Sequence, residues 1–173
     1  SIVFCLFQIS LGGFVRVSGS GLGCPDWPLC YGKLIPPMNY TTLIEWGHRT
    51  SGVILGTLII ISTILVWIKK RNDYLLIFTI SATLITVVIV GLIGGIIVLS
   101  ELDPRIRTIH LFFSQLVILL LGISLVIVNS ESIFLSLIKQ SVNQKHSILL
   151  ILSSALIMIT LLSGSYAVWK GAG

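Results

Sequence analysis

Residues 74–99 read YLLIFTISATLITVVIVGLIGGIIVL and contain no charged side chain. A helix rises 1.5 Å per residue, so a helix of this length exceeds the roughly 30 Å hydrocarbon core of a bilayer. Gly91, Gly94 and Gly95 would let a neighbouring helix approach closely. The sequence therefore predicts a membrane-spanning helix from Tyr74 to Leu99.

Similar apolar stretches flank this segment on both sides. They predict further helices at Ile2–Val17, Leu43–Ile68, about Ile106–Asn129 and Ser147–Val168. Hydrophobic residues make up 55% of the 173 positions and charged residues only 10%, whereas about a quarter of a soluble domain is charged. We therefore expect an all-α, polytopic membrane protein.

The helices group into a four-helix transmembrane bundle and the start of a second one. The first bundle spans 1–129, a cytoplasmic linker spans 130–146, and the first helix of a truncated second bundle spans 147–173. A weak recurrence supports the second copy: the spacing of Gly164, Tyr166, Gly171 and Gly173 repeats that of Gly12, Phe14, Gly19 and Gly21. Internal duplication is common in membrane proteins.

The net charge of +5 does not indicate a nucleic-acid partner, because the basic residues form no stripe with interleaved aromatic residues. Alternating spans put loop 18–42 and turn 100–105 on one side of the membrane, and loops 69–73 and 130–146 on the other. Lys and Arg are nearly balanced between the sides, so the positive-inside rule says little. The cluster Lys69-Lys70-Arg71 favours the second side as cytoplasmic and loop 18–42 as extracytoplasmic.

Two histidines stand near the starts of helices that enter from the same side. His48 belongs to the second expected helix and His110 to the fourth, so we expect their imidazoles at similar depth. Facing histidines in a four-helix bundle can hold a heme iron, with a ring-sized gap between them. Packing or hydrogen bonding is the alternative for each, although ionisable groups within a membrane often serve a function.

Glu45 precedes His48 by three residues, which places both side chains on one helix face. One interpretation is a carboxylate in the first helical turn, favoured by the helix dipole. The other is a carboxylate beside a bound macrocycle that handles protons during oxidation. The sequence leaves both open.

Cys24 and Cys30 bracket five residues, two of them proline. This spacing differs from that of zinc ribbons and thioredoxin sites, and it favours a disulfide in an oxidising compartment. Cys5 lies inside the first helix, and we interpret it as an inert core thiol.

Four arginines lie at helix ends on the side of both histidines, namely Arg16, Arg49, Arg105 and Arg107. Such residues often reach lipid head groups. A guanidinium also suits bidentate contact with a ligand carboxylate, such as a heme propionate. Arg16 and Arg49 are our candidates for the second role.

Several motifs together resemble one family. The sequence GGFVRVSGSGLGCPDWPLCYG spans residues 12–32, IEWGHR spans 44–49, and IHL spans 109–111. This pattern is similar to the heme A synthase family of cytochrome oxidase assembly, and the similarity covers essentially the whole chain.

The resemblance implies eight helices in two pseudo-symmetric bundles. It implies that His48 and His110 flank the substrate heme O and bind its iron, that Glu45 is the catalytic carboxylate, and that Cys24 and Cys30 form an outer-loop disulfide. The reaction it implies is oxidation of a porphyrin methyl group to a formyl group, through successive hydroxylations, giving heme A. A heme b would belong to the C-terminal bundle.

The chain ends at Gly173, before a second histidine pair, so we expect a fragment of the full enzyme; His146 lies on the opposite side and does not substitute. Membrane lipid surrounds such a protein, and candidate partners are heme O synthase, an electron acceptor and a second copy of the chain. The expected location is the plasma membrane of a prokaryote or the mitochondrial inner membrane. The competing hypotheses are a bis-histidine cytochrome b in electron transfer and a thiol-disulfide membrane protein.

Overall fold

The computed structural model describes residues 1–129 together with Ile159 and Ser163. Across this part of the chain the secondary structure is helical: α1 (Ile2–Val17), α2 (Tyr40–Lys69), α3 (Tyr74–Leu99) and α4 (Pro104–Val128). α2, α3 and α4 are long and apolar enough to cross a membrane, and α1 is a shorter apolar helix. The predicted all-α membrane fold is confirmed. The expected linker 130–146 and, apart from Ile159 and Ser163, the expected helix from Ser147 to Val168 lie outside the described residues.

Capping residues set the helix starts, and they correct two predicted bounds. α2 begins at Tyr40 instead of Leu43, because the Asn39 side chain accepts a hydrogen bond from Thr42 N at 3.1 Å. α4 begins at Pro104 instead of Ile106, because Asp103 accepts from the Arg105 backbone N–H at 2.8 Å. Polar side chains of this kind satisfy backbone donors that the first helical turn leaves unpaired.

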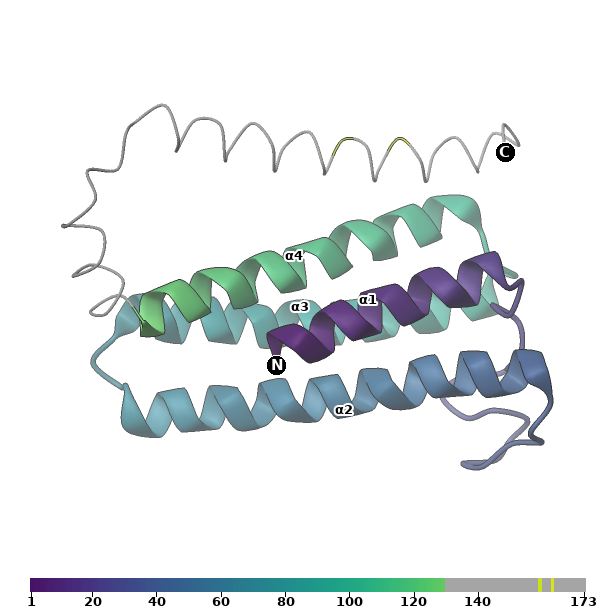
Figure 1. Cartoon of the computed structure of the whole chain (residues 1–173), viewed down its shortest axis with the longest axis horizontal. Helices are drawn as coiled ribbons and strands as arrows, with labels where there is room; N and C mark the ends of the chain where they lie inside the picture. Colours follow the sequence, from purple (N-terminus) through teal and green to yellow (C-terminus); the bar gives the residue numbers. More distant parts are fainter. Residues whose placement is uncertain (130–158, 160–162, 164–173) are drawn as a thin grey trace.

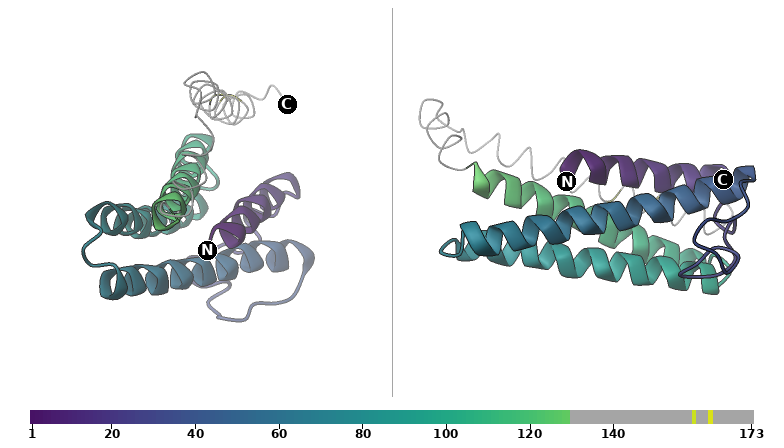
Figure 2. Two further views of the ribbon diagram at one scale, coloured as in Figure 1. Left: turned by 60° about the vertical axis from the view of Figure 1, so that its left-hand side comes forward. Right: turned by 90° about the horizontal axis from the view of Figure 1, so that it is seen from below.

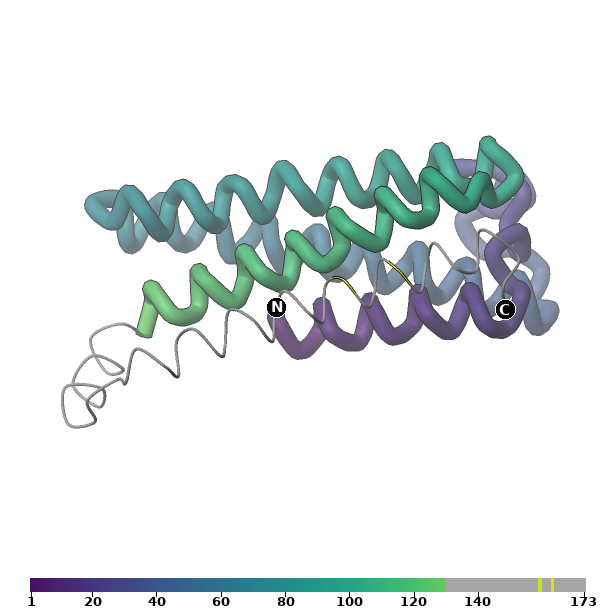
Figure 3. The backbone as a smooth tube through the Cα atoms, turned by 90° about the horizontal axis from the view of Figure 1, so that it is seen from above, coloured from purple at the N-terminus to yellow at the C-terminus, as the bar shows by residue number. Residues whose placement is uncertain are grey.

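The four helices run alternately up and down, each beside the next one in the chain (Figure 1). Contacts join α1 with α2, α2 with α3, α3 with α4, and α4 with α1, whereas the pairs α1–α3 and α2–α4 make none. α2 and α4 therefore stand diagonally across the bundle. Figure 2 shows this arrangement from two further directions. In Figure 3, α4 leaves the turn that joins it to α3 and then diverges from α3 along its length.

The hydrophobic core lies in the half of the bundle away from the loop that joins α1 to α2. Its buried members come from all four helices and are Cys5, Leu55, Ile59, Ile80, Val117 and Leu121. Cys5 is a free, buried cysteine, as the sequence analysis expected. Ser124 on α4 also donates to Thr79 Oγ1 on α3 at 3.0 Å, in the manner of polar contacts between membrane helices.

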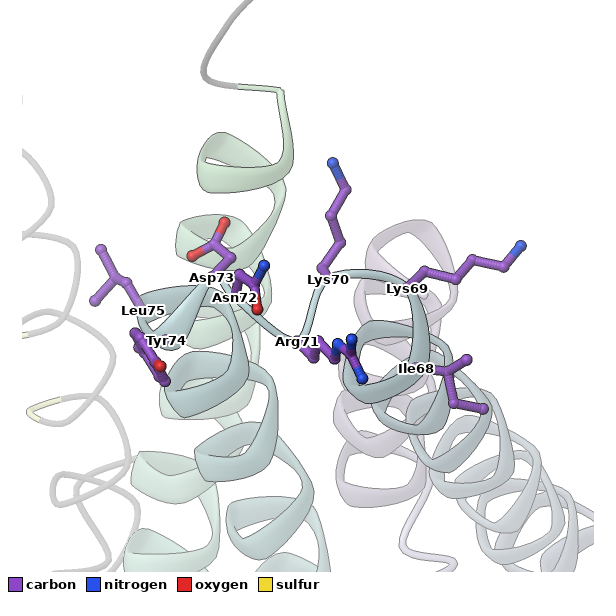
Figure 4. A pocket seen from close by; sticks show the side chains of 8 residues that line it. All are labelled: Ile68, Lys69, Lys70, Arg71, Asn72, Asp73, Tyr74 and Leu75. Atoms are coloured by element: carbon purple, nitrogen blue, oxygen red, sulfur yellow. The ribbon is translucent and has the colours of Figure 1, made fainter.

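Connections at the two ends of the bundle differ in chemistry. The loop 18–39 and the α3–α4 turn share one end, where Leu102 lies against Gly21 (Figure 1). The α2–α3 turn lies at the opposite end and carries Lys69, Lys70 and Arg71. Figure 4 shows this turn as an open hollow in which Lys69 and Lys70 point outward. The predicted separation of loop 18–42 from the basic cluster is confirmed.

Candidate functional site

His48 lies near the start of α2 and packs against α1. A Cβ atom on Gly12 would stand only 3.0 Å from His48 Cε1, so the ring occupies the space that this glycine leaves. Gln8, one turn earlier on α1, places its amide nitrogen 3.2 Å from His48 Nδ1 and donates to the His48 carbonyl oxygen at 3.0 Å. Because Nδ1 is engaged, Nε2 is the ring nitrogen left for a ligand.

His110 lies near the start of α4 and packs against α3. A Cβ atom on Gly94 would stand 3.4 Å from His110 Cε1. The backbone carbonyl of Val90 interacts with the ring, but His110 Nδ1 is buried and makes no hydrogen bond within the described residues. Leaving a buried polar atom unpaired costs about 1–3 kcal/mol.

The two histidines share one end of the bundle but belong to helices that stand diagonally. No group of three or more His, Cys, Asp or Glu residues in the described part could hold a metal ion alone. A metal ion between these two imidazoles would therefore need further ligands from outside the His, Cys, Asp and Glu side chains of the described residues. The ring-sized gap between them stays a prediction.

Glu45 and Arg49 form a buried ion pair one turn apart on α2. Arg49 Nε donates to Glu45 Oε1 at 2.8 Å, and the two side chains are 15% and 7% exposed. α2 begins at Tyr40 and has no acidic residue in its first turn, so the interpretation of Glu45 as a first-turn carboxylate is wrong. The carboxylate is held by Arg49.

The remaining Arg49 donors hold the loop over this end of the bundle. Nη1 donates to the carbonyl oxygens of Asp26 at 2.6 Å and Leu29 at 3.0 Å, and Nη2 donates to that of Cys24 at 2.8 Å. Together with the bond to Glu45, these use four of the five N–H groups of the guanidinium. Arg49 thus joins Glu45 to three loop carbonyls, a role that the sequence analysis did not foresee.

The loop is closed by a disulfide between Cys24 and Cys30, whose Cα atoms lie 4.8 Å apart. The predicted pairing is therefore present. Cys24 is 0% and Cys30 2% exposed. A thiol-exchange partner would have to open the loop before it reached either sulfur, which counts against the thiol-disulfide hypothesis.

Asp26 organises the turn inside this loop. Its carboxylate accepts the backbone N–H groups of Tyr31 at 2.6 Å and Gly32 at 2.7 Å, both residues having positive φ. The hydrogen bond from Gly32 is the main cause that holds the pKa of Asp26 below its usual value. The ionised carboxylate therefore stabilises the turn at neutral pH.

Close backbone contacts seat the loop on α2 and α3. Thr42 Oγ1 donates to the Gly23 carbonyl at 2.8 Å, and a Cβ atom on Gly23 would overlap the Thr41 carbonyl oxygen. On the other side, a Cβ atom on Gly95 would stand 2.7 Å from Trp27 Cδ2. The loop thus lies against the ends of α2 and α3 that carry His48 and Gly94.

A groove of about 150 Å³ runs between this loop and the outer side of α2. Trp46, Arg49 and Val53 line it from the helix, and Leu29 and Lys33 from the loop. Neither histidine lines it, and neither lines the hollow of Figure 4. These hollows therefore do not locate the candidate site, which is defined by the paired imidazoles and the Glu45–Arg49 pair.

Arg16, the second arginine expected to contact a ligand, is exposed in the last turn of α1. Gln8 was not predicted from the sequence, although one signal was present. Gln8 and Gly12 are four residues apart, as are His48 and Gly52, so each pair lies on one helix face. Recognising that these faces meet requires the register between α1 and α2.

Known proteins resemble this chain over much of its length. Heme A synthase of Bacillus pumilus is 32% identical over 114 residues, which is 62% of this chain and 36% of the relative. Heme A synthase of Symbiobacterium thermophilum is 32% identical over 64% of this chain and 37% of the relative. For that of Exiguobacterium sp. the identity is 38%, over 61% of this chain and 36% of the relative. The matched region spans little more than a third of each relative.

No solved structure matches the chain. The profile of the COX15-CtaA family, described as cytochrome oxidase assembly protein, matches residues 1–173. Because this match extends over the whole sequence, the chain belongs to the COX15-CtaA family of cytochrome oxidase assembly proteins.

Proposed function

We propose that this chain forms part of a heme A synthase, in which it binds heme O between His48 and His110 and oxidises a methyl group of the porphyrin to a formyl group. The observation that carries the proposal is the pair of histidines on diagonal helices, each seated against a glycine of the adjacent helix. The name heme A synthase borne by relatives at 25–42% identity supports the same function.

The donor set suits an iron porphyrin. His48 and His110 would hold the iron of a heme with two neutral imidazoles, and the porphyrin would supply the remaining ligands. The glycines Gly12 and Gly94 contribute by keeping side chains off the outer edges of the imidazoles.

Glu45 is the proposed catalytic carboxylate. Conversion of a methyl to a formyl group takes up the oxygen of one water and releases four electrons and four protons, so a base near the substrate and an external electron acceptor are both required. Arg49 engages Oε1 of Glu45, and Oε2 makes no hydrogen bond within the described residues. Oε2 is therefore the oxygen that we assign to proton transfer.

Arg49 and Arg16 are proposed to contact the heme propionates. Arg49 supports this role because one of its Nη2 hydrogens is not used by the loop carbonyls or by Glu45. Arg16 supports it by its exposure at the same end of the bundle. Both guanidinium groups could pair with carboxylates at the membrane surface.

The protein is an integral membrane protein, and we propose the plasma membrane of a prokaryote or the mitochondrial inner membrane as its location. The disulfide supports an extracytoplasmic position of the loop, because disulfides persist in oxidising compartments. We further propose heme O synthase and an electron acceptor as partners, a heme b in the remainder of the full-length protein, and self-association.

The test is to produce the full-length protein in cells that make heme O and to identify the extracted porphyrins by mass. We expect formyl and hydroxymethyl porphyrins with the wild type and neither with His48→Ala or His110→Ala. If the protein binds heme through both histidines but leaves every methyl group intact, the chain is an electron-transfer cytochrome instead. If heme binding is insensitive to both substitutions, the site is elsewhere.

Glu45→Gln separates chemistry from folding. The amide keeps the shape of the side chain but cannot carry the charge or take up a proton. We expect this variant to insert and bind heme O with a wild-type absorption spectrum, while formyl product falls by about 10²-fold or more, as for loss of a general acid or base. Near-normal product would remove Glu45 from catalysis, and loss of heme binding would make its role structural.

A further inference from the structure

The two histidines occupy equivalent notches, but their surroundings differ: Gln8, Ser51 and Gly52 near His48 correspond in sequence position to Val90, Phe113 and Ser114 near His110. In the antiparallel pair α1–α2, His48 lies on Gly12, and Gln8 lies on Gly52, where a Cβ atom would stand 3.2 Å from Gln8 Nε2. In the pair α3–α4, His110 lies on Gly94. The residue four positions before Gly94 is Val90, which corresponds to Gln8.

Gln8 is fixed by more than its contact with the ring. Its Nε2 donates to the His48 carbonyl oxygen at 3.0 Å and stands 3.2 Å from Nδ1, and its Oε1 accepts from Ser51 Oγ. The Ser51 hydroxyl in turn lies 2.9 Å from the His48 carbonyl. This network holds the amide against the ring edge that faces away from Nε2.

A carboxamide can serve either tautomer of the imidazole. With its N–H toward Nδ1, it supports the ring that carries its proton on Nε2. With its oxygen toward Nδ1, it accepts Nδ1–H and leaves the Nε2 lone pair free for a metal. Ser51 can donate to the amide oxygen or accept from the amide nitrogen, so this bond survives the exchange of the two ends. The hydrogen bond from Gln8 Nε2 to the His48 carbonyl does not survive it, so the amide oxygen must turn from that carbonyl toward Nδ1–H.

We propose that Gln8 is a positioning residue that makes His48 the more firmly held ligand of the heme iron. His110 has Val90 at the position equivalent to Gln8, and it is the weaker and more readily exchanged ligand. The inference rests on the proposed binding of heme between these histidines. Hydrogen bonding at Nδ1–H orients a ligating imidazole and raises its basicity. His110 has no side-chain partner of this kind among the described residues: its Nδ1 is buried and unpaired, and the group that interacts with its ring is the backbone carbonyl of Val90.

The test uses the full-length protein in detergent, loaded with heme B added as hemin. His110→Ala leaves His48 as the single axial ligand, and His48→Ala leaves His110. After reduction, resonance Raman spectroscopy gives the iron–histidine stretching frequency of the resulting five-coordinate heme. A hydrogen bond at Nδ1 raises this frequency, and hemes with two axial histidines elsewhere in the protein do not contribute to the band.

A matched pair of substitutions exchanges the residue that stands one turn before each glycine, Gln8 or Val90. In the His110→Ala protein, Gln8→Val should lower the iron–histidine frequency and weaken heme affinity by about 10- to 100-fold, the usual effect of losing such a partner. In the His48→Ala protein, Val90→Gln should raise the frequency toward that of the His48-ligated heme. Gln8→Glu should keep or raise the frequency, because a carboxylate also accepts Nδ1–H.

The outcomes separate the inference from the proposed function. If hemin shows the same spectrum with and without His48 and His110, the heme site itself is wrong. If the histidines bind hemin but Gln8→Val and Val90→Gln leave the frequencies unchanged, the positioning role of Gln8 is wrong and the heme site stands. If Gln8→Val fails to fold, Val90→Gln decides, and the absence of an upward shift overturns the inference.

Discussion

Arg49→Ala is the substitution that should damage this end of the bundle most. It removes four hydrogen bonds at once: one to Glu45 and three to carbonyls of the disulfide loop. The loop would lose its main polar anchor on α2, and Glu45, whose side chain is 7% exposed, would be left without its counter-ion.

The expected loss follows from the burial of the ion pair. Removing one partner of a buried pair costs about 3–5 kcal/mol, because the other charge stays desolvated. Arg49→Lys keeps a positive charge near Glu45, but a single ammonium cannot reach both the carboxylate and the three carbonyls. Losing hydrogen bonds to a charged group costs about 1.5–3 kcal/mol. We therefore expect Lys to lie between Arg and Ala in the free energy of unfolding.

The assay is unfolding of the full-length protein in detergent micelles by added SDS, followed by circular dichroism. Proteolysis of the loop between Ser18 and Asn39 serves as a local readout. Arg16→Ala is the matched control, since Arg16 is an exposed arginine at the same end. It should change the free energy of unfolding by less than about 0.5 kcal/mol.

A double substitution tests the cause. If the penalty comes from the uncompensated Glu45 charge, Arg49→Ala should cost about 0.5–3 kcal/mol less when Glu45 is already Gln. An equal cost in both backgrounds would mean that the loop carbonyls carry the whole effect. A cost no larger than that of Arg16→Ala would refute the assignment of Arg49 as the anchor of the loop.

Three further expectations concern the loop. Gly23→Ala should destabilise the protein by about 1–3 kcal/mol and expose the loop to protease, because the added Cβ atom overlaps the Thr41 carbonyl oxygen; wild-type resistance would show that the backbone relaxes freely. The depressed pKa of Asp26 means that its stabilising effect is complete above about pH 4, the unfolded value, and is lost as the pH falls through the lower folded value. Protease resistance of the wild-type loop should therefore fall in that acidic range. Asp26→Asn should lower the resistance of the loop at neutral pH and remove its further fall in acid. If the variant still loses resistance in acid as the wild type does, the role of the Asp26 carboxylate is wrong. Finally, a membrane-impermeant maleimide applied to intact cells after external reduction should label Cys24 and Cys30, and labelling only after lysis would reverse the proposed topology.

Much of the site could be predicted from local sequence. An ionisable side chain within an apolar helix is costly, so His48, His110 and Glu45 stand out without any structure. The cysteine spacing indicated the disulfide for a similar local reason. The helix starts were less accurate, because Asn39 and Asp103 satisfy backbone donors ahead of the apolar segments.

Hydropathy determined by itself that this chain is a helical membrane protein, because the transfer of each segment into lipid depends only on that segment. Which residues meet depends on the register between helices, and sequence periodicity does not contain it. Packing decides the register: Gly12 accepts His48, Gly52 accepts Gln8, and the carbonyls of the closed loop converge on Arg49. The partner of His48 and the second role of Arg49 were therefore decided only by the tertiary structure, in which side chains fill the space that glycines on the neighbouring helix leave open.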